Sequence, residues 1–331
     1  MMESRYFGKT GEKIFVIGLG TYGHGDAYGG IRKEESFEIF KSLLEKFPDD
    51  AKILVDTAPR YGEGRVEQWI GDFMNLLGRD RFLIATKGGR HIEVGRVNEK
   101  DFTSKFIEKD LDDSLKRLNL SQIFLYQLHN PGLDVIKEGS IFKLLEYFVI
   151  QGKIKWYGIS IDDPAEGLAA IDICRSQGHH HLASLQLIYN LLWKNSYNDL
   201  FEKARTNAIA LIAREPLLRG FLTGKYGFDD DFIDSPEAVQ KQIKVYGKES
   251  ILMRVEEVRN ILAQSGLNIS LAQLGIQFSV LNHNIAITIP GINRLKYVEE
   301  DINPATVHID SLTLSCLKSL KDLEIHKNKG L

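Results

Sequence analysis

The stretch Ile123-Phe124-Leu125-Tyr126-Gln127-Leu128 decides the fold class, because it is short and almost wholly apolar on both faces of an expected strand. Strands of this kind suit a parallel sheet that helices cover on both sides. Amphipathic stretches with helical spacing separate it from six similar runs along the chain. These runs cover residues 53–55, 82–85, 156–159, 185–187, 209–213 and 285–289.

Residues 15–20 add a first strand to this series, which gives an eightfold alternation of strand and helix. The alternation predicts an α/β fold of the (β/α)8, or TIM-barrel, class. Repeated βα units alone do not fix the topology, so a doubly wound sheet remains the alternative.

Two further segments extend this barrel pattern. Residues 5–17 predict an N-terminal β-hairpin that turns at residues 8–11. After the seventh strand, the polar residues 218–250 predict a long loop on the face where barrel enzymes carry their active sites. Because no linker or sharp change of composition interrupts the chain, we expect a single domain over residues 1–331.

The composition excludes several classes of partner. Lys plus Arg number 42 against 45 for Asp plus Glu, which gives a net charge of -3 and no electrostatic footprint for nucleic acid or an anionic membrane. Cys174 and Cys316 stand far apart and have no metal-ligand or redox spacing. No apolar stretch approaches the ~18 residues of a membrane span, and residues 1–13 lack the apolar part of a signal peptide. We therefore predict a cytoplasmic protein.

Three consecutive histidines, His179-His180-His181, suggest a metal site at first sight. Three neighbouring side chains on a strand cannot all point at one ion, and no Cys or acidic residue stands nearby in the sequence. We predict no metal, and an exposed polar turn at this position.

Residues 18–23 (GLGTYG) match the G-x-G-x-x-G pattern of a Rossmann-type dehydrogenase, and Asp56 ends the next strand, where that fold keeps its ribose-binding acid. That motif needs a helix to open at once, yet further glycines follow and helical spacing starts only near Lys33. We predict that these glycines form a strand-end turn where the backbone approaches a ligand closely, with a plain turn as the alternative.

A second constellation is more specific. Residues 55–64 (VDTAPRYGEG), with Glu67 and Gly71 on the following helix, precede residues 85–88 (ATKG) and 126–131 (YQLHNP). In combination these motifs resemble those of the aldo-keto reductases. The resemblance implies a catalytic set at the ends of three successive strands, made of Asp56, Tyr61, Lys87 and His129.

These residue types suit the reduction of a carbonyl group. Hydride delivered to the carbonyl carbon leaves negative charge on the oxygen, which has to be protonated. A phenol with a pKa of about 10 is a weak acid for this task. The resemblance gives Lys87 the role of the nearby ammonium that makes Tyr61 a better proton donor. Asp56 would then hold Lys87 in place, and His129 would donate to the carbonyl oxygen and orient the substrate.

The resemblance extends to a nicotinamide cofactor. Ser160 and Gln186 match residues that hydrogen-bond the nicotinamide carboxamide, an amide that needs both a donor and an acceptor. Ile161 stands where the family often has Asn, and Arg214 stands where many members place an aromatic ring under the nicotinamide. Further cofactor-binding residues are expected at the first strand end and in the segment that wraps the pyrophosphate: Gly20, Thr21, Tyr22, Leu217, Gly220, Leu222, Gly224 and Lys225.

Residues 289–294 (IPGINR) resemble the adenosine end of the cofactor site. Gly291 replaces a common Lys, which leaves Arg294 as the main candidate for the 2′-phosphate of NADP. Glu300 matches the family pattern, whereas Asp301 replaces a common Asn and removes one donor from the adenine contact. We expect NADP as the cofactor, with NAD as the alternative.

The expected activity is reversible hydride transfer between NADP(H) and a small carbonyl compound or sugar-like alcohol, the work of an alcohol or aldose dehydrogenase. Two alternatives remain: a nicotinamide-binding regulatory subunit of the same fold without fast turnover, and a Rossmann-type dehydrogenase that uses residues 18–23. Expected substrate-binding residues mix aromatic and polar groups: Tyr22, His24, Asn130 and Trp193.

Overall fold

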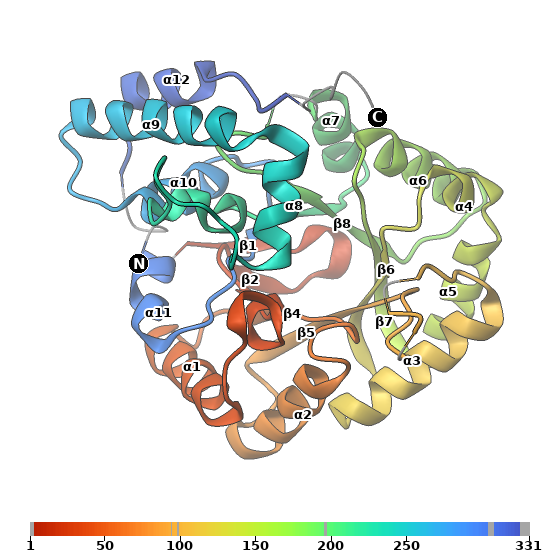
Figure 1. Ribbon diagram of the computed structural model, residues 1–331. Coiled ribbons are helices and arrows are strands. Elements are labelled where there is room, and N and C mark those ends of the chain that lie inside the picture. Colours follow the sequence, from red (N-terminus) through yellow and green to blue (C-terminus); the bar gives the residue numbers. More distant parts are fainter. Residues whose placement is uncertain (1–2, 94, 98, 195–196, 304–307, 325–331) are drawn as a thin grey trace.

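The computed structural model describes residues 3–93, 95–97, 99–194, 197–303 and 308–324. Within them, parallel strands form an eight-stranded sheet in the order β10-β9-β8-β7-β6-β5-β4-β3 (Figure 1). Their bounds are Leu19–Gly20 for β3, Ile53–Asp56 for β4, Phe82–Gly88 for β5, Ile123–His129 for β6, Ile154–Ser160 for β7, Leu182–Ile188 for β8, Ala210–Arg214 for β9 and Ile287–Thr288 for β10.

The two edges of this sheet meet, so the sheet is a closed barrel. A parallel bridge joins Ile17 to Thr288. The amide of Gly18 donates to the Thr288 carbonyl at 2.9 Å, and the amide of Thr288 donates to the Val16 carbonyl at 2.8 Å. Closure confirms the predicted (β/α)8 class and excludes the doubly wound sheet, which keeps two open edges.

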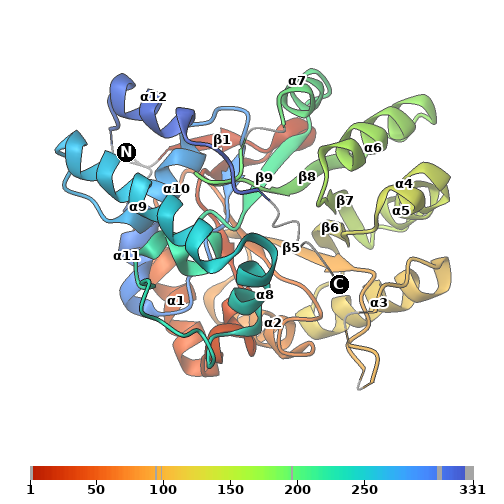
Figure 2. The same ribbon diagram turned by 45° about the horizontal axis from the view of Figure 1, so that its top comes forward.

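Helices surround the strands in both views (Figures 1 and 2). Their starts follow local signals: Asp163 caps a helix whose first residue is Pro164, as the sequence predicts, by accepting from the Ala165 amide. The helices are α1 (Lys33–Lys46), α2 (Arg65–Leu77), α3 (Ser104–Leu118), α4 (Leu133–Glu138), α5 (Ser140–Ile150), α6 (Pro164–Ser176), α7 (Asn198–Thr206), α8 (Glu237–Tyr246), α9 (Lys248–Ser265), α10 (Leu271–Val280), α11 (Leu295–Ile302) and α12 (Ser311–Ser319).

The predicted N-terminal hairpin is present and closes the lower end of the barrel. Strands β1 (Ser4–Tyr6) and β2 (Lys13–Phe15) are antiparallel. Between them the fully buried Phe7 lies 5.9 Å from the ring of Phe124 on β6. A Cβ atom on Gly8, whose φ is +52°, would lie 2.6 Å from the Ala208 carbonyl oxygen, so this turn requires glycine.

The expected first strand over residues 15–20 is divided in the structure. Phe15 ends the hairpin strand β2, and only Leu19–Gly20 pairs with β4. The residues between them bond to the closing strand instead, through the Val16 carbonyl and the Gly18 amide. One apolar run therefore contributes in succession to the N-terminal hairpin, to the contact that closes the barrel and to strand β3.

The connection after β9, the seventh barrel strand, is long, but it is more ordered than the expected loop. It contains the 3-10 helix η4 (Leu218–Thr223) and helix α8. Val239 and Tyr246 of α8 are buried, and α8 packs against both η4 and α9. Residues 218–250 are mostly polar, so their composition did not indicate a helix. One buried face is nevertheless enough to pack α8 against its neighbours.

The glycines of residues 18–23 serve contacts between strands. A Cβ on Gly18 would lie 2.6 Å from the Leu54 carbonyl oxygen, and one on Gly20 would lie 3.0 Å from that of Ile289. Helix α1 begins only at Lys33, so no helix opens at the motif. The Rossmann alternative is therefore wrong, because its cofactor phosphates need that helix N-terminus.

The three histidines at 179–181 do not converge. His179 bonds to the Gln177 side chain at 3.0 Å, and Nδ1 of His181 lies 2.6 Å from a Glu146 carboxylate oxygen. In the part of the chain that the structure describes, no group of three or more His, Cys, Asp or Glu side chains could hold a metal ion. Among the same residues, no helix is long and apolar enough to cross a membrane.

Candidate active site

Three of the four expected catalytic side chains meet inside the upper end of the barrel. Nζ of Lys87, at the end of β5, donates to Oδ2 of Asp56 at 2.6 Å and to the Thr57 carbonyl at 3.0 Å. The same nitrogen donates to the hydroxyl oxygen of Tyr61 at 3.3 Å. All three side chains are buried, and Tyr61, at 9%, is the most exposed of them, against 3% for Asp56 and 1% for Lys87.

Two glutamines that face into the barrel complete the environment of Asp56. Its other carboxylate oxygen, Oδ1, accepts from Nε2 of Gln186 at 2.7 Å and from Nε2 of Gln127 at 3.2 Å. Asp56 thus holds the ammonium with one oxygen and is itself held through the other. The amide of Gln186, expected at the nicotinamide carboxamide, donates into this interior layer instead.

His129 ends β6 directly beside this group. Its register partner on β7 is Ser160, and Lys87 lies opposite Gln127, two residues before His129. Burial lowers the pKa of His129 well below its ordinary value, and the charges of Lys87, Arg60, Arg90 and Arg214 lower it further. The imidazole is therefore neutral at physiological pH and carries one N–H donor.

The ammonium of Lys87 keeps its charge despite its burial. Burial acts to lower the pKa of Lys87, but the Asp56 carboxylate and Tyr61 outweigh it, so that the pKa lies above its ordinary value. A positive charge is thus fixed 3.3 Å from the phenol oxygen in a region that water does not reach.

Ser160 and Asn130 form the next polar pair around the barrel rim. Oγ of Ser160 donates to Oδ1 of Asn130 at 3.4 Å. Asn130 adopts a positive φ of +56°, which turns its side chain back over the strand end. These two residues, expected to contact cofactor and substrate respectively, therefore stand together.

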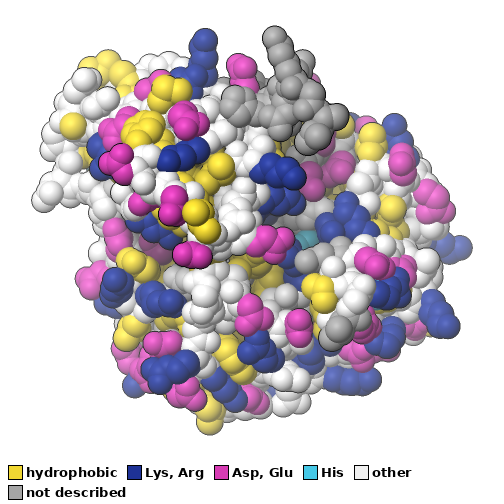
Figure 3. All heavy atoms as spheres, viewed as in Figure 1, with side chains coloured by type: hydrophobic (Ala, Val, Ile, Leu, Met, Phe, Trp, Pro, Cys, Tyr) yellow, Lys and Arg dark blue, Asp and Glu magenta, His cyan; other side chains and the backbone are white. Residues whose placement is uncertain are grey.

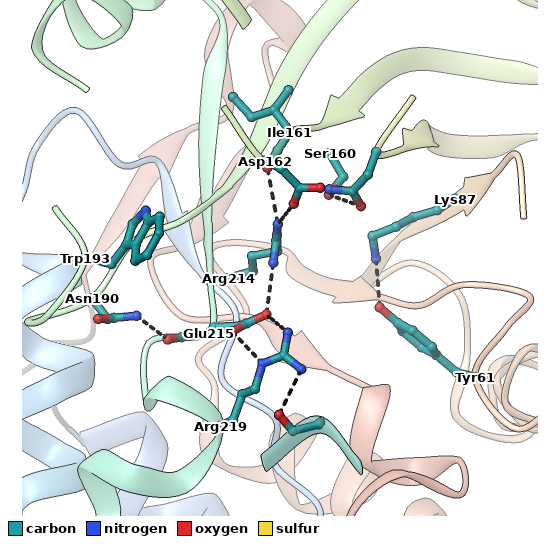
Figure 4. A network of polar contacts seen from close by, with 12 residues as sticks. Tyr61, Lys87, Ser160, Ile161, Asp162, Asn190, Trp193, Arg214, Glu215 and Arg219 are labelled. Carbon is teal, nitrogen blue, oxygen red and sulfur yellow. Dashed lines mark hydrogen bonds and ion pairs between the residues drawn. The ribbon is translucent and has the colours of Figure 1, made fainter. Parts of the chain in front are cut away.

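A network of two arginines with Asp162 and Glu215 lies next to Ser160 on the rim (Figure 4). Arg214 contacts Oδ1 of Asp162 at 2.8 Å and Oε1 of Glu215 at 3.0 Å. Arg219 contacts Oε1 of the same Glu215 at 2.9 Å and Oε2 at 3.0 Å. The two guanidinium charges outweigh burial and hold the pKa of Glu215 below its ordinary value.

Glu215 and Arg219 are residues that the sequence analysis missed. Both have a positive φ, +56° and +54°, and the chain reverses sharply after β9, so that Glu215 contacts Arg214 and Arg219 contacts Glu215. A buried acid directly after a strand-end arginine was the available signal, since charges are rarely buried without partners.

The expected pyrophosphate segment forms the turn of η4. Gly220 and Gly224 both have positive φ, +95° and +75°, and the Gly224 amide donates to the Phe221 carbonyl. Leu222 is buried, whereas Leu217 is half-buried and Lys225 is exposed. The segment therefore exposes backbone and one cation at the carboxyl end of β9.

At the expected adenosine end, Arg294 donates to the carbonyls of Asn293 at 2.7 Å and Gly30 at 3.2 Å. A Cβ on Gly291 would meet no atom within 4 Å, so this position borders open space.

Oε1 of Glu300 accepts from Ser270 at 2.6 Å. Burial raises the pKa of Asp301 to about 8, so this carboxyl group carries a proton at neutral pH. The protonated carboxyl is a hydrogen-bond donor, as the Asn that is common at this position would be.

The remaining expected residues at the first strand end differ in exposure. Oγ1 of Thr21 donates to the Asp56 carbonyl at 2.9 Å, which fixes the strand end beside the site. The Tyr22 ring is half-buried and lies 5.2 Å from the Tyr61 ring. His24 is buried, with Nδ1 at 2.8 Å from Ser36 Oγ and Nε2 at 2.7 Å from the Ile292 carbonyl. Both of its ring nitrogens are engaged, so His24 supports the loop and has no free polar group for a substrate.

Trp193 lies on the far side of the opening. Its indole nitrogen donates to the hydroxyl of Tyr197 at 3.2 Å, and its ring lies 5.4 Å from that of Tyr246 on α8. The close-up shows Trp193 next to Asn190, whose amide donates to the Glu215 carbonyl at 3.0 Å (Figure 4). The tryptophan is thus tied to the segment that carries the arginine network.

This geometry agrees with the comparisons to known proteins. The Aldo/keto reductase family model matches residues 16–322, and the chain belongs to that family. An aldo-keto reductase of Schizosaccharomyces pombe, whose name carries NADP(+), is 30% identical over 94% of this chain and 89% of its own length. A solved aldo-keto reductase from Bacillus halodurans, in its holo form, has a TM-score of 0.77 and 20% identity, with 99% of each chain covered.

Members of this family are oxidoreductases that generally reduce carbonyl groups with nicotinamide cofactors. The relatives also include a probable voltage-gated potassium channel subunit beta of Arabidopsis thaliana, 25% identical over 92% of each chain. Family membership alone therefore does not separate a catalyst from a regulatory subunit of the same fold.

Proposed function

We propose that the protein is an NADP(H)-dependent reductase of a small aldehyde, ketone or sugar, working reversibly on the matching alcohol. The observation that carries this proposal is the contact of the buried Lys87 ammonium with both the Asp56 carboxylate and the Tyr61 hydroxyl. A regulatory subunit without turnover needs no buried cation fixed beside a phenol.

The residues divide the chemistry as follows. A reduced nicotinamide, when bound, would supply the hydride that the carbonyl carbon accepts. Tyr61 donates its proton to the carbonyl oxygen, and Lys87 stabilises the negative charge left on the phenol oxygen. Asp56 keeps the ammonium in place, and the neutral His129 donates a hydrogen bond to the carbonyl oxygen before and during the transfer.

The rim residues fit a nicotinamide cofactor. Nε of Arg214 is buried without a partner among the described residues, and the planar guanidinium stands at a strand end where a flat ring could stack. Ser160 and Asn130 offer a hydroxyl and an amide to the carboxamide group. The η4 backbone with Lys225 would hold the pyrophosphate, and the open space at Gly291 would admit the adenosine.

The proposed preference for NADP rests on Arg294. Its hydrogen bonds go to two neutral backbone carbonyls, which leave its charge available for a 2′-phosphate. Arg294→Ala should weaken NADPH binding by about 10- to 100-fold, the value of one charge-assisted contact, and should leave NADH nearly unchanged. Equal losses for both cofactors, measured by fluorescence titration, would remove the basis for NADP.

The direct test is the loss of absorbance of NADPH or NADH when aldehydes, ketones and aldoses are added to the purified protein. Carbonyl-dependent oxidation of the cofactor is expected with at least one class. Tight cofactor binding without turnover on any class would instead favour the regulatory subunit. With a small molecule as partner, a cytoplasmic location remains our prediction.

A further inference from the structure

Positive charge gathers around the mouth of the candidate site. Four cations bear on His129, namely Lys87, Arg60, Arg90 and Arg214. Lys and Arg side chains, with some Asp and Glu side chains between them, border a hollow on this face, and a histidine is visible within it (Figure 3). The exposed ends of the barrel strands thus present cations to whatever enters.

These cations differ in whether an acidic side chain neutralises them. Lys87 is paired with Asp56, and Arg214 with Asp162 and Glu215. Arg60 makes no hydrogen bond or ion pair with any residue that the structure describes. Its guanidinium carbon instead lies 5.6 Å from the centre of the Tyr22 ring. Arg60 is therefore a half-buried cation held by an aromatic face.

Arg90 occupies the neighbouring strand end. Its Nε donates to the backbone carbonyl of His129 at 3.1 Å, a neutral acceptor. Burial lowers the pKa of Arg90, and the positive charge of Arg60 lowers it further, while Asp162 opposes both effects. Two half-buried guanidinium groups therefore repel each other beside the proposed proton donor, and an anion close to both would relieve that repulsion.

This pair lies away from the proposed cofactor phosphates. Arg60 follows β4 and Arg90 follows β5, whereas the pyrophosphate segment and Arg294 follow β9 and β10. Counted around the closed barrel, β5 lies opposite β9, whereas β4 lies two strands from β10. The two arginines thus follow other strands than the residues expected to hold the nucleotide phosphates.

We infer that Arg60 and Arg90 form an anion-binding subsite, and that the carbonyl substrate carries a carboxylate or phosphate group a short chain away from its reacting carbon. This inference rests on the proposed function, because it places the reacting carbon at Tyr61 and His129. Planar guanidinium groups bind both kinds of anion through paired N–H donors. Arg60 is the main determinant, and Arg90 also positions the end of β6 through the His129 carbonyl.

The test compares pairs of substrates that differ only in the anionic group. Succinic semialdehyde is compared with butanal, and glyceraldehyde 3-phosphate with glyceraldehyde, each with the enzyme saturated in reduced cofactor. Arg60→Gln removes the charge without breaking a hydrogen bond of the described residues. Arg175→Gln is the matched control, because it removes an exposed arginine from the last turn of α6, at the opposite end of the barrel.

The wild type should prefer at least one anionic aldehyde by about tenfold or more in kcat/KM. Arg60→Gln should lower that value by about 10- to 100-fold and change the neutral partner by less than about threefold. The pair that shows the larger effect identifies carboxylate or phosphate as the anion. Equal losses on charged and neutral aldehydes, or a wild type that prefers the neutral ones, would overturn the inference while the reductase proposal stands.

A binding measurement separates this inference from the proposed activity. Calorimetric titration of the cofactor-loaded protein with succinate and with inorganic phosphate at low ionic strength should show saturable binding of at least one ion. Arg60→Gln should weaken that binding about tenfold or more, and Arg175→Gln should not. If the protein reduces no carbonyl but binds an anion in a way that depends on Arg60, the proposed reductase activity is wrong and the anion-binding subsite is supported. No saturable binding of either ion would sink the subsite.

Discussion

Thr86 and Lys87 are neighbours on β5, yet their side chains enter two different buried ionic clusters. Successive side chains of a strand point to opposite faces, so Lys87 faces the barrel interior and Thr86 faces the helices. Lys87 bonds to Asp56 at 2.6 Å, and the hydroxyl of Thr86 donates to Glu67 of α2 at 2.6 Å. Glu67 is in turn paired with Arg117 of α3 at 2.7 Å.

The two clusters differ in what their partners leave available. Glu67 is fully buried, and its carboxylate oxygens are shared among Thr86, Ser114 and Arg117. In the other cluster the third partner of Lys87 is Tyr61, which is held at the longer distance of 3.3 Å and is the most exposed of the three side chains, at 9%. We infer that the Glu67 cluster, whose buried charge is fully paired, serves stability. In the Lys87 cluster, one more loosely held and more exposed partner makes the same kind of ion pair available for chemistry.

The largest expected effect is on turnover in the Lys87 cluster. Tyr61→Phe deletes one oxygen and keeps the ring, so turnover should fall by about 10²- to 10⁴-fold, the range for a positioned general acid. Cofactor affinity and thermal stability should hardly change. The control is Tyr157→Phe, which removes a phenol oxygen that bonds to Glu146 on the helix side of β7 and should keep full turnover. A Tyr61→Phe protein that keeps most of its activity would show that the Lys87 cluster does not supply the proton, and the proposed difference between the two clusters would be wrong.

The next effect is on stability in the Glu67 cluster. Glu67→Gln leaves Arg117 without its buried counter-charge, and should lower the free energy of unfolding by about 3 kcal/mol. Turnover of the folded protein, measured well below the melting temperature, should remain near that of the wild type. Urea unfolding and steady-state rates on the same sample check both parts. A large loss of turnover with unchanged stability would mean that the two clusters are not distinct.

The sequence predicts one cluster much better than the other. Asp56, Tyr61, Lys87 and His129 end strands that are apolar on both faces, and a closed barrel brings all such ends to one rim. Gln127 and Gln186 complete the layer but were not recognised as holders of Asp56. The signal was present, because a polar side chain within an otherwise apolar buried strand needs a polar partner in the interior.

Features that depend on local backbone reversal could not be predicted from residue patterns. The network of Glu215 and Arg219 exists because both residues adopt a positive φ after β9, and neither is of a type that favours this conformation. His24 was expected at the substrate as one of a set of aromatic and polar residues, but the fold of its loop directs both ring nitrogens to Ser36 and Ile292. Proximity in sequence does not give the direction of a side chain.

A smaller effect would sharpen the contrast between the two neighbours on β5. Thr86→Val keeps the shape of the side chain and removes its hydrogen bond to Glu67, a bond to a charged group worth about 2 kcal/mol of stability. Because the change lies on the helix face, turnover should stay within about twofold of the wild type. The measurement is again urea unfolding with steady-state kinetics. If Thr86→Val instead lowers turnover tenfold at full stability, then the helix face of β5 also takes part in catalysis, and the division between a catalytic interior face and a stabilising helix face is wrong.

The smallest expected effect is a pH dependence within the helix-side cluster. Asp110 of α3 is buried, and one of its carboxylate oxygens accepts from the Gly89 amide at 3.0 Å. Burial raises its pKa to about 7, and the nearby Glu67 carboxylate acts in the same direction. The folded protein therefore binds this proton more tightly than the unfolded chain, whose carboxyl has a pKa of about 3.9.

A raised pKa in the folded state means that its contribution to stability is complete below pH 4 and is lost as the pH rises through 7. Nearly all of this loss falls between pH 4 and pH 7, and between pH 6 and pH 7 it should be about 1 kcal/mol for this one group. Asp110→Asn cannot ionise, so the difference in unfolding free energy between the two proteins should shift by that amount over this interval. Asp301 also titrates here, with a pKa of about 8, but it is present in both proteins and cancels in the difference. A difference that is the same at both pH values would show that Asp110 is already ionised at pH 6, and that the helix-side cluster accommodates a second buried negative charge beside Glu67.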